Sequence, residues 1–247
     1  MSVILSYWQR RGGEFVKRSW RAGWTFLIGS ALYLQASMLA ASEQGYQQHN
    51  DARQQLFRSP LLVQLQLGLA SDADFGPSLF FIADPSRERT SLASLSVGRR
   101  LATRLWRWQA DVVGYVGVQN YHERGRQPDS YGLTLYWKAY RQWWPDWLGM
   151  PLRVGLGQGL SYASRIPVAE QRDFEPRQSA ELVHYLEWTL QLPLTGLLRV
   201  AGIETGLDPE KWWFGYSIFH RSTVFGLFAD APGGVNYPGL TFEYVLY

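Results

Sequence analysis

The sequence contains no cysteine among its 247 residues, which excludes both a disulfide framework and a thiolate metal site. This absence suits an oxidising compartment. Outside the N-terminal segment, the chain also lacks an uninterrupted apolar run of the length that a transmembrane helix needs. A chain of this length is typical of one domain or of a small two-domain protein.

An excess of basic residues is also missing once the N-terminal segment is set apart. The formal charge of the whole chain is +3, but residues 1–41 hold five basic residues and one acidic residue. The remainder therefore carries 19 basic and 20 acidic residues. Because the basic character belongs to the N-terminal segment, the composition gives no reason to expect a nucleic-acid partner.

The N-terminal segment has the organisation of an export signal. Residues 1–41 have a basic start, an apolar stretch over residues 22–34 and small residues at Ala40 and Ala41. This pattern predicts a secretory signal peptide over 1–41, with cleavage near Ala40 or Ala41. An N-terminal membrane anchor is the alternative interpretation. Residues 42–59 are polar and rich in glutamine, and we expect them to form a periplasmic lead-in.

From residue 60 onward, apolar and polar residues alternate with a period of two, which indicates β-strands. The expected strands cover residues 61–70, 91–102, 106–119, 131–139, 152–162, 182–192, 212–222 and 236–246. Residues 101–105 are expected to form the turn before the third strand. The long loop 71–90 contains an apolar patch at 79–82, and a short helix is expected at 195–202.

The fold class that this pattern predicts is all-β, an antiparallel transmembrane β-barrel of eight strands over residues 60–247. The strands have the length that a tilted membrane crossing requires, and Trp and Tyr gather at their ends. Eight strands enclose a lumen that side chains fill, so no pore is expected. A soluble sandwich is the competing fold. A ten-stranded barrel, with extra strands at 78–84 and 196–206, is the alternative strand count.

The last expected strand ends in alternating apolar and aromatic residues, as exported barrels do. We therefore expect the protein in the outer membrane of a Gram-negative bacterium, with the C-terminal strand recognised by the barrel-assembly machinery. An even strand number places the loops 71–90, 120–129, 163–178 and 223–235 outside the cell. Outer-membrane lipid, either lipopolysaccharide or phospholipid, is the expected partner.

Three polar residues interrupt the apolar face of the last two strands. His220 and Ser222 share one face because they are two residues apart, and Asn236 begins the following strand on the same face. An imidazole beside a hydroxyl can act as the general base for a serine nucleophile, and a third polar group can orient the ring. The pattern thus predicts Ser222, His220 and Asn236 as catalytic residues. Asp230 and Glu175 are rival third members.

This stretch resembles two families of outer-membrane lipid hydrolases. The His-x-Ser at 220–222 is similar to the motif of the lipid A 3-O-deacylase family and of outer-membrane phospholipase A. The strand count and the last-hairpin position favour the deacylase, whereas an Asn as third member is like the phospholipase. The resemblance covers about the last 35 residues. Thr223 departs from both families, which tend to have Asn after the serine.

The resemblance implies an esterase that removes an acyl chain from lipid A or from a phospholipid. His184 has outward parity on the neighbouring strand and is a candidate substrate-binding residue. Arg221 is a second one, provided that the strand end bulges and turns the side chain toward lipid phosphate. No cofactor is expected, and the sequence shows no metal-ligand constellation. The alternative functions are a non-catalytic barrel with a structural, adhesion or envelope-stability role and, less favoured, a porin.

Overall fold

The computed structural model describes residues 59–82, 84–105, 108–145, 148–173, 179–223 and 234–246. Eight strands form the barrel: β1 (Leu61–Leu69), β2 (Ser91–Leu105), β3 (Trp108–His122), β4 (Ser130–Trp143), β5 (Leu152–Ala163), β6 (Leu182–Pro193), β7 (Trp212–Ser222) and β8 (Gly234–Leu246). In the described parts of the connections lie three short helices, α3 (Phe75–Leu79), α4 (Val168–Asp173) and α5 (Leu194–Val200). The predicted signal peptide and nearly all of the predicted lead-in lie outside the described residues.

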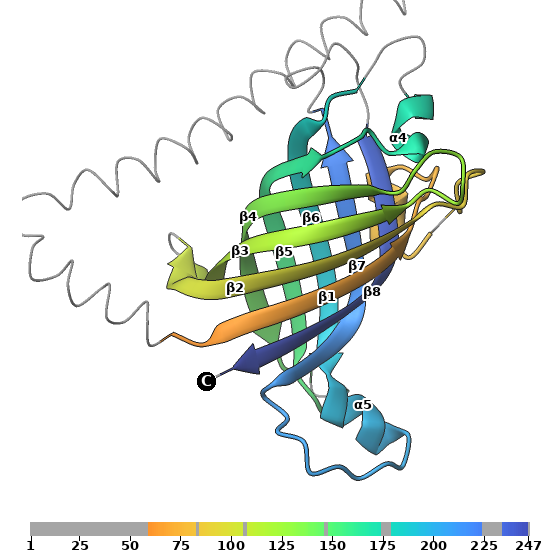
Figure 1. Ribbon diagram of the computed structural model, residues 1–247. Helices are drawn as coiled ribbons and strands as arrows, with labels where there is room; N and C mark the ends of the chain where they lie inside the picture. The colour runs from red at the N-terminus through yellow and green to blue at the C-terminus, as the bar shows by residue number, and fades with distance from the viewer. Residues whose placement is uncertain are drawn as a thin grey trace, which may run out of the picture. The chain divides into compact units, whose positions relative to one another are not determined.

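The strands pair in sequence order, and β8 returns to β1 to close the barrel (Figure 1). Every pairing is antiparallel, and at the closing seam Leu65 lies opposite Phe242. The closed ring leaves neither β1 nor β8 with an unpaired edge, which a strand in lipid cannot tolerate. The predicted eight-stranded antiparallel barrel is confirmed.

Alternation along each strand separates an apolar outer face from a polar lumen. On β4, Leu133 and Leu135 point outward, and Leu135 is 61% exposed, whereas Thr134 and Tyr136 between and beside them are buried. The same exposed apolar positions recur around the wall, at Leu67, Leu95, Val116, Val118, Leu156 and Leu240. An outward apolar belt with buried polar residues inside is the arrangement of a membrane-spanning barrel. No helix in the described part of the chain is long and apolar enough to span a bilayer.

The structure differs from the sequence-based expectation at one predicted turn and at the two extra strands of the ten-stranded alternative. Residues 101–105 continue β2 instead of forming a turn, and Leu105 pairs directly with Trp108. The strand considered at 78–84 is wrong, because α3 ends within it and the following residues close tight turns on Pro77 and Ser78. The strand considered at 196–206 is also wrong, since α5 occupies its first part. That helix confirms the short helix expected at 195–202.

Ion pairs fill the lumen. Lys138 Nζ lies 2.6 Å from Glu187 Oε1, and both side chains are completely inaccessible to solvent. The same carboxylate accepts hydrogen bonds from the Gln64 and Gln66 amides, at 2.7 and 2.8 Å, and from the Tyr185 hydroxyl. Buried charges are tolerated where each is paired and hydrogen-bonded, as this pair is. The filled lumen matches the expectation that an eight-stranded barrel has no pore.

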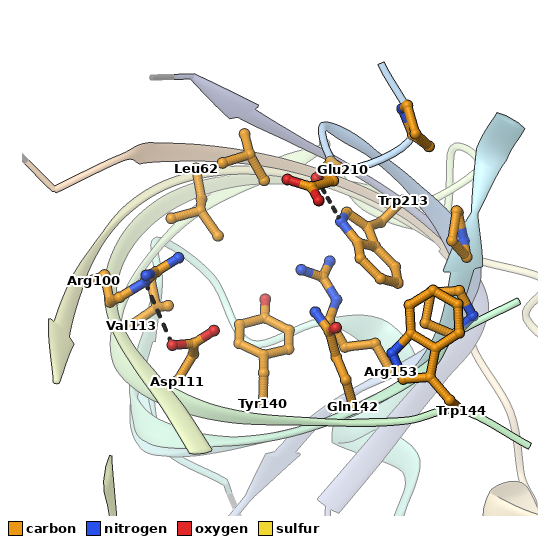
Figure 2. A pocket seen from close by; sticks show the side chains of 14 residues that line it. Leu62, Arg100, Asp111, Val113, Tyr140, Gln142, Trp144, Arg153, Glu210 and Trp213 are labelled. Atoms are coloured by element: carbon orange, nitrogen blue, oxygen red, sulfur yellow. Dashed lines mark hydrogen bonds and ion pairs between the residues drawn. The ribbon is translucent and has the colours of Figure 1, made fainter. Parts of the chain in front are cut away.

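A cavity of about 360 Å³ opens at the end of the barrel that carries α5 (Figure 2). Arg153 reaches into it, with its guanidinium carbon 4.1 Å from the centre of the Trp213 ring and 4.6 Å from that of Tyr140. Arg100 and Asp111 form an ion pair at 3.5 Å across from them. Arg153 is neutralised by Glu243 at 2.6 Å. Both arginines of the cavity are thus paired with a neighbouring carboxylate. No serine or histidine of the described residues lines the cavity.

At the opposite end, the β3–β4 connection is held by a pair of exposed side chains. His122 Nδ1 lies 2.9 Å from Asp129 Oδ2, and the backbone N–H of Glu123 donates to the other carboxylate oxygen. These two hydrogen bonds, that of His122 first, hold the pKa of Asp129 below its usual range.

This pair predicts an acid-dependent loss of stability. A depressed folded-state pKa contributes stability above the unfolded-state pKa of an aspartate, about 4, and that contribution is lost as pH falls through the folded-state value. The free energy of unfolding of Asp129→Asn should thus decline less on acidification below about pH 4 than that of the wild type. Urea titrations followed by tryptophan fluorescence at neutral and acidic pH measure the difference. Equal declines would show that the pair does not hold the folded loop.

Candidate functional site

The three residues predicted as catalytic meet on the outer wall of the barrel, at the end of β7 and the start of β8. His220 lies directly opposite Asn236 in the β7–β8 register, and Ser222 lies opposite Gly234. Their neighbours Phe219, Arg221 and Tyr237 point into the lumen and are fully buried. Strand alternation therefore fixes His220, Ser222 and Asn236 on one face, as the sequence predicts.

Two polar atoms of this group lack hydrogen-bond partners within the described part of the chain. They are His220 Nδ1 and Asn236 Oδ1, and both are buried. An unpaired buried polar atom costs roughly 1–3 kcal/mol, so two of them on directly opposed residues call for an explanation. One Nδ1–H···Oδ1 hydrogen bond would satisfy both atoms. It would also leave the other ring nitrogen, Nε2, without a proton and able to accept one.

The Asn236 carboxamide is oriented by the β1–β2 connection. Its Nδ2 donates a 2.7 Å hydrogen bond to the carbonyl of Ala73, while its backbone carbonyl accepts from the N–H of Ser71 at 2.9 Å. Because the amide nitrogen is committed to Ala73, the amide oxygen is the atom left for His220. This connection thus supplies one side of the site, which sequence reasoning missed. The only signal for it was the apolar patch inside an otherwise polar loop.

The same connection covers the histidine. The ring of Phe75, on α3, lies 5.2 Å from the His220 ring at an interplanar angle of 48°. His220 is consequently half-buried, although it belongs to the outer face of the barrel. A substrate that enters from the side would need direct access to the imidazole of His220. In this structure the ring of Phe75 shields that imidazole.

His184 stands on the other side of Ser222. It lies opposite Ser222 in the β6–β7 register and is half-buried. Directly opposed residues of antiparallel strands have Cβ atoms about 4.5–5.5 Å apart. The serine thus lies between two imidazoles, one along its own strand and one across the sheet. This placement agrees with the outward parity expected of His184.

Arg221 lies inside the barrel and does not face the lipid. Its Nε is 2.7 Å from Glu170 Oε2, on α4, and its Nη1 donates to Ser161 Oγ at 2.8 Å. Nη2 donates to the carbonyls of Ala180 and Glu181. β7 continues in regular register through this position, so no bulge turns the side chain outward. Its guanidinium instead ties α4 and the start of β6 to the lumen.

Gly234 gives the site its close packing. A side chain at this position would place its Cβ 2.7 Å from His220 Cε1 and would also collide with the carbonyl oxygen of Arg221. Only glycine therefore allows the imidazole to lie against β8. The rival third members Asp230 and Glu175 lie outside the described residues. Within the described ranges, no three His, Asp or Glu residues cluster as a metal ion would require.

Comparison with known proteins gives a distant structural similarity. No protein-family model matches the chain, and no curated protein matches it at a significant level. Among the solved structures, the chain is similar to the crystal structure of the outer membrane enzyme PagL, with 11% sequence identity and a TM-score of 0.45. The match covers 74% of this chain and 98% of the other. The assignment of an eight-stranded barrel rests on the strand pairing itself.

Proposed function

We propose that the protein is an outer-membrane serine esterase that removes an acyl chain from lipid A or a phospholipid in the outer leaflet. One observation carries the proposal: His220 Nδ1 and Asn236 Oδ1 lie on directly opposed residues beside Ser222 on the lipid-facing wall, and neither atom has another hydrogen-bond partner among the described residues. Polar groups on such a face are costly and are usually retained for function. A tautomer-fixing hydrogen bond and an adjacent serine are the parts of an activated nucleophile.

Each residue has a defined role in this reaction. His220 Nε2 takes the proton of the Ser222 hydroxyl while the serine oxygen attacks the ester carbonyl. The protonated imidazole then gives its proton to the departing alcohol, and water hydrolyses the acyl–serine ester in a second, equivalent round. Asn236 Oδ1 accepts from Nδ1–H and holds the ring. The backbone N–H of Gly234 is a candidate donor to the oxyanion.

His184 borders the serine and is the proposed substrate-side residue, whereas Arg221 takes no part because its guanidinium is committed inside the lumen. The proposed orientation places the His220 end of the barrel at the outer leaflet, with the β1–β2, β3–β4, β5–β6 and β7–β8 connections outside. Export by a signal peptide over 1–41 and recognition of β8 by the barrel-assembly machinery complete the proposal. It requires neither a cofactor nor a metal.

The deciding experiment identifies the product. Purified protein, refolded and shown to be folded by its heat-dependent gel mobility, is incubated with lipopolysaccharide and, separately, with phospholipid vesicles. Mass spectrometry should show the loss of one defined acyl chain from one of these lipids. A serine-directed fluorophosphonate should modify Ser222, and the modified peptide locates the site. Folded protein that releases no acyl chain and takes no label would refute the proposal.

A second candidate function, a non-catalytic barrel, is favoured by one observation. Phe75 and Ala73 cover His220 and Asn236 through a ring contact and a 2.7 Å hydrogen bond. In that case the polar residues serve to dock the β1–β2 connection against the wall. The two functions differ in whether this cover moves when the protein meets lipid.

A further inference from the structure

The β1–β2 connection exposes three successive apolar side chains beside the site. Phe80, Phe81 and Ile82 are 77%, 57% and 59% exposed. They follow α3 and are held by backbone hydrogen bonds to the carbonyls of Pro77 and Ser78. Single exposed apolar residues are common, but three together on one hydrogen-bonded turn mark a contact surface.

The backbone of this turn is conformationally strained at Phe81. Phe81 has a φ of 62°, in the left-handed region that a bulky aromatic residue rarely adopts. Such strain persists only where the surroundings hold it. Here the Phe81 ring packs on Tyr216 with ring centres 4.6 Å apart, and the Tyr216 hydroxyl donates to the carbonyl of Ser78 at 3.0 Å. The turn is therefore fastened to the outside of β7.

The surface is continuous with the lipid-facing belt of the barrel. Tyr216 pairs with Leu240 on β8, and Leu240 pairs with Leu67 on β1; both leucines are exposed on the outer wall. Asp74 and Asp84, one on each side of the apolar turn, are exposed to solvent. Charged residues stay at the headgroup level, so they limit how deeply the turn can enter a bilayer.

We infer that Phe80, Phe81 and Ile82 form a lipid-binding surface that inserts among the acyl chains next to the wall of β7 and β8. The turn and the cover of the site are one segment, since α3 carries Phe75 against His220 and Ala73 binds Asn236. Lipid that binds the turn therefore also affects the position of the segment that covers His220 and Asn236. The part of this inference that concerns access to Ser222 rests on the proposed function, whereas insertion itself does not.

Insertion is tested by fluorescence quenching. The chain has no cysteine, so Phe80→Cys creates a single labelling site for an environment-sensitive fluorophore. The labelled full-length protein is folded into phosphatidylcholine vesicles whose acyl chains carry bromine near the headgroups. Leu135→Cys on the outer wall is the lipid-exposed reference, and Pro128→Cys in the exposed β3–β4 connection is the water-exposed one. We expect quenching at Phe80 comparable to that at Leu135. Quenching as weak as at Pro128 overturns the inference.

A second measurement links the surface to the site. Phe80→Ser/Ile82→Ser should lower acyl release from vesicle lipid about tenfold or more, but should leave hydrolysis of a short-chain, water-soluble ester unchanged. Val200→Ser/Ile203→Ser, which removes two exposed apolar residues at the other end of the barrel, is the matched control and should change neither rate. Equal losses on both esters would show a folding defect and count against the surface. If the wild type hydrolyses no ester, the proposed function fails while the quenching result still decides insertion.

Discussion

Replacing Ser222 with alanine is expected to lower acyl release by about 10³-fold or more, because the reaction loses its nucleophile. His220→Ala should cause a loss of similar size, since a neutral serine hydroxyl is a weak nucleophile without a base. Residues that act as one unit are not additive. The double variant should therefore be no slower than either single variant, which initial rates of acyl release will measure.

The chain offers matched controls for these substitutions. Ser217→Ala makes the same change on the same strand, but its hydroxyl faces the lumen and is buried, so the rate should not fall. His184→Ala tests the second imidazole beside the serine. If His184→Ala lost all acyl release while His220→Ala stayed active, the general base would be His184 and not His220. Retention of activity in Ser222→Ala would rule out the serine mechanism.

The second large effect concerns the lumen. Glu187→Ala should lower the free energy of unfolding by about 3–5 kcal/mol, because it leaves the ammonium of Lys138 buried without its counter-ion. The amides of Gln64 and Gln66 lose the same acceptor. Denaturant titration of the barrel in vesicles, followed by tryptophan fluorescence, measures the change. Acyl release is read only under conditions where the variant remains folded.

Glu181→Ala is the control for this prediction. Glu181 is exposed near the start of β6, so its loss should change stability by no more than about 0.5 kcal/mol. Lys138→Met/Glu187→Leu removes both charges and should recover much of what Glu187→Ala loses, as apolar replacement of a buried pair often does. A loss of less than about 1 kcal/mol in Glu187→Ala would mean that water reaches Lys138 in the lumen.

Period-two alternation was sufficient to predict the barrel and the orientation of its residues. The parity of His220, Ser222 and Asn236 follows from strand geometry alone, and so does the inward direction of Arg221. The error at 101–105 has a physical origin: the residues of LATRL read equally well as a turn or as a strand end. β-Propensity is weak where a strand leaves the membrane and both faces are exposed.

The cover of the site could not be predicted in the same way. It depends on Asn236 meeting Ala73 and on Phe75 meeting His220, contacts between segments far apart in the chain. Local periodicity carries no information about such pairs. The choice of Glu187 as the partner of Lys138 is of the same kind, because several acidic residues have inward parity and only closure of the barrel selects among them.

The seam between β1 and β8 has a kinetic consequence. It joins the first strand of the barrel to the last, so its hydrogen bonds close a loop that contains every intervening strand. Contacts between residues so distant in sequence slow folding, because the entropy of closing the loop is lost before any pairing energy is gained. Until then β1 and β8 each present an unsatisfied edge. Sealing of this seam is thus the natural final step of assembly, and the interval before it is when the chain is most exposed to aggregation.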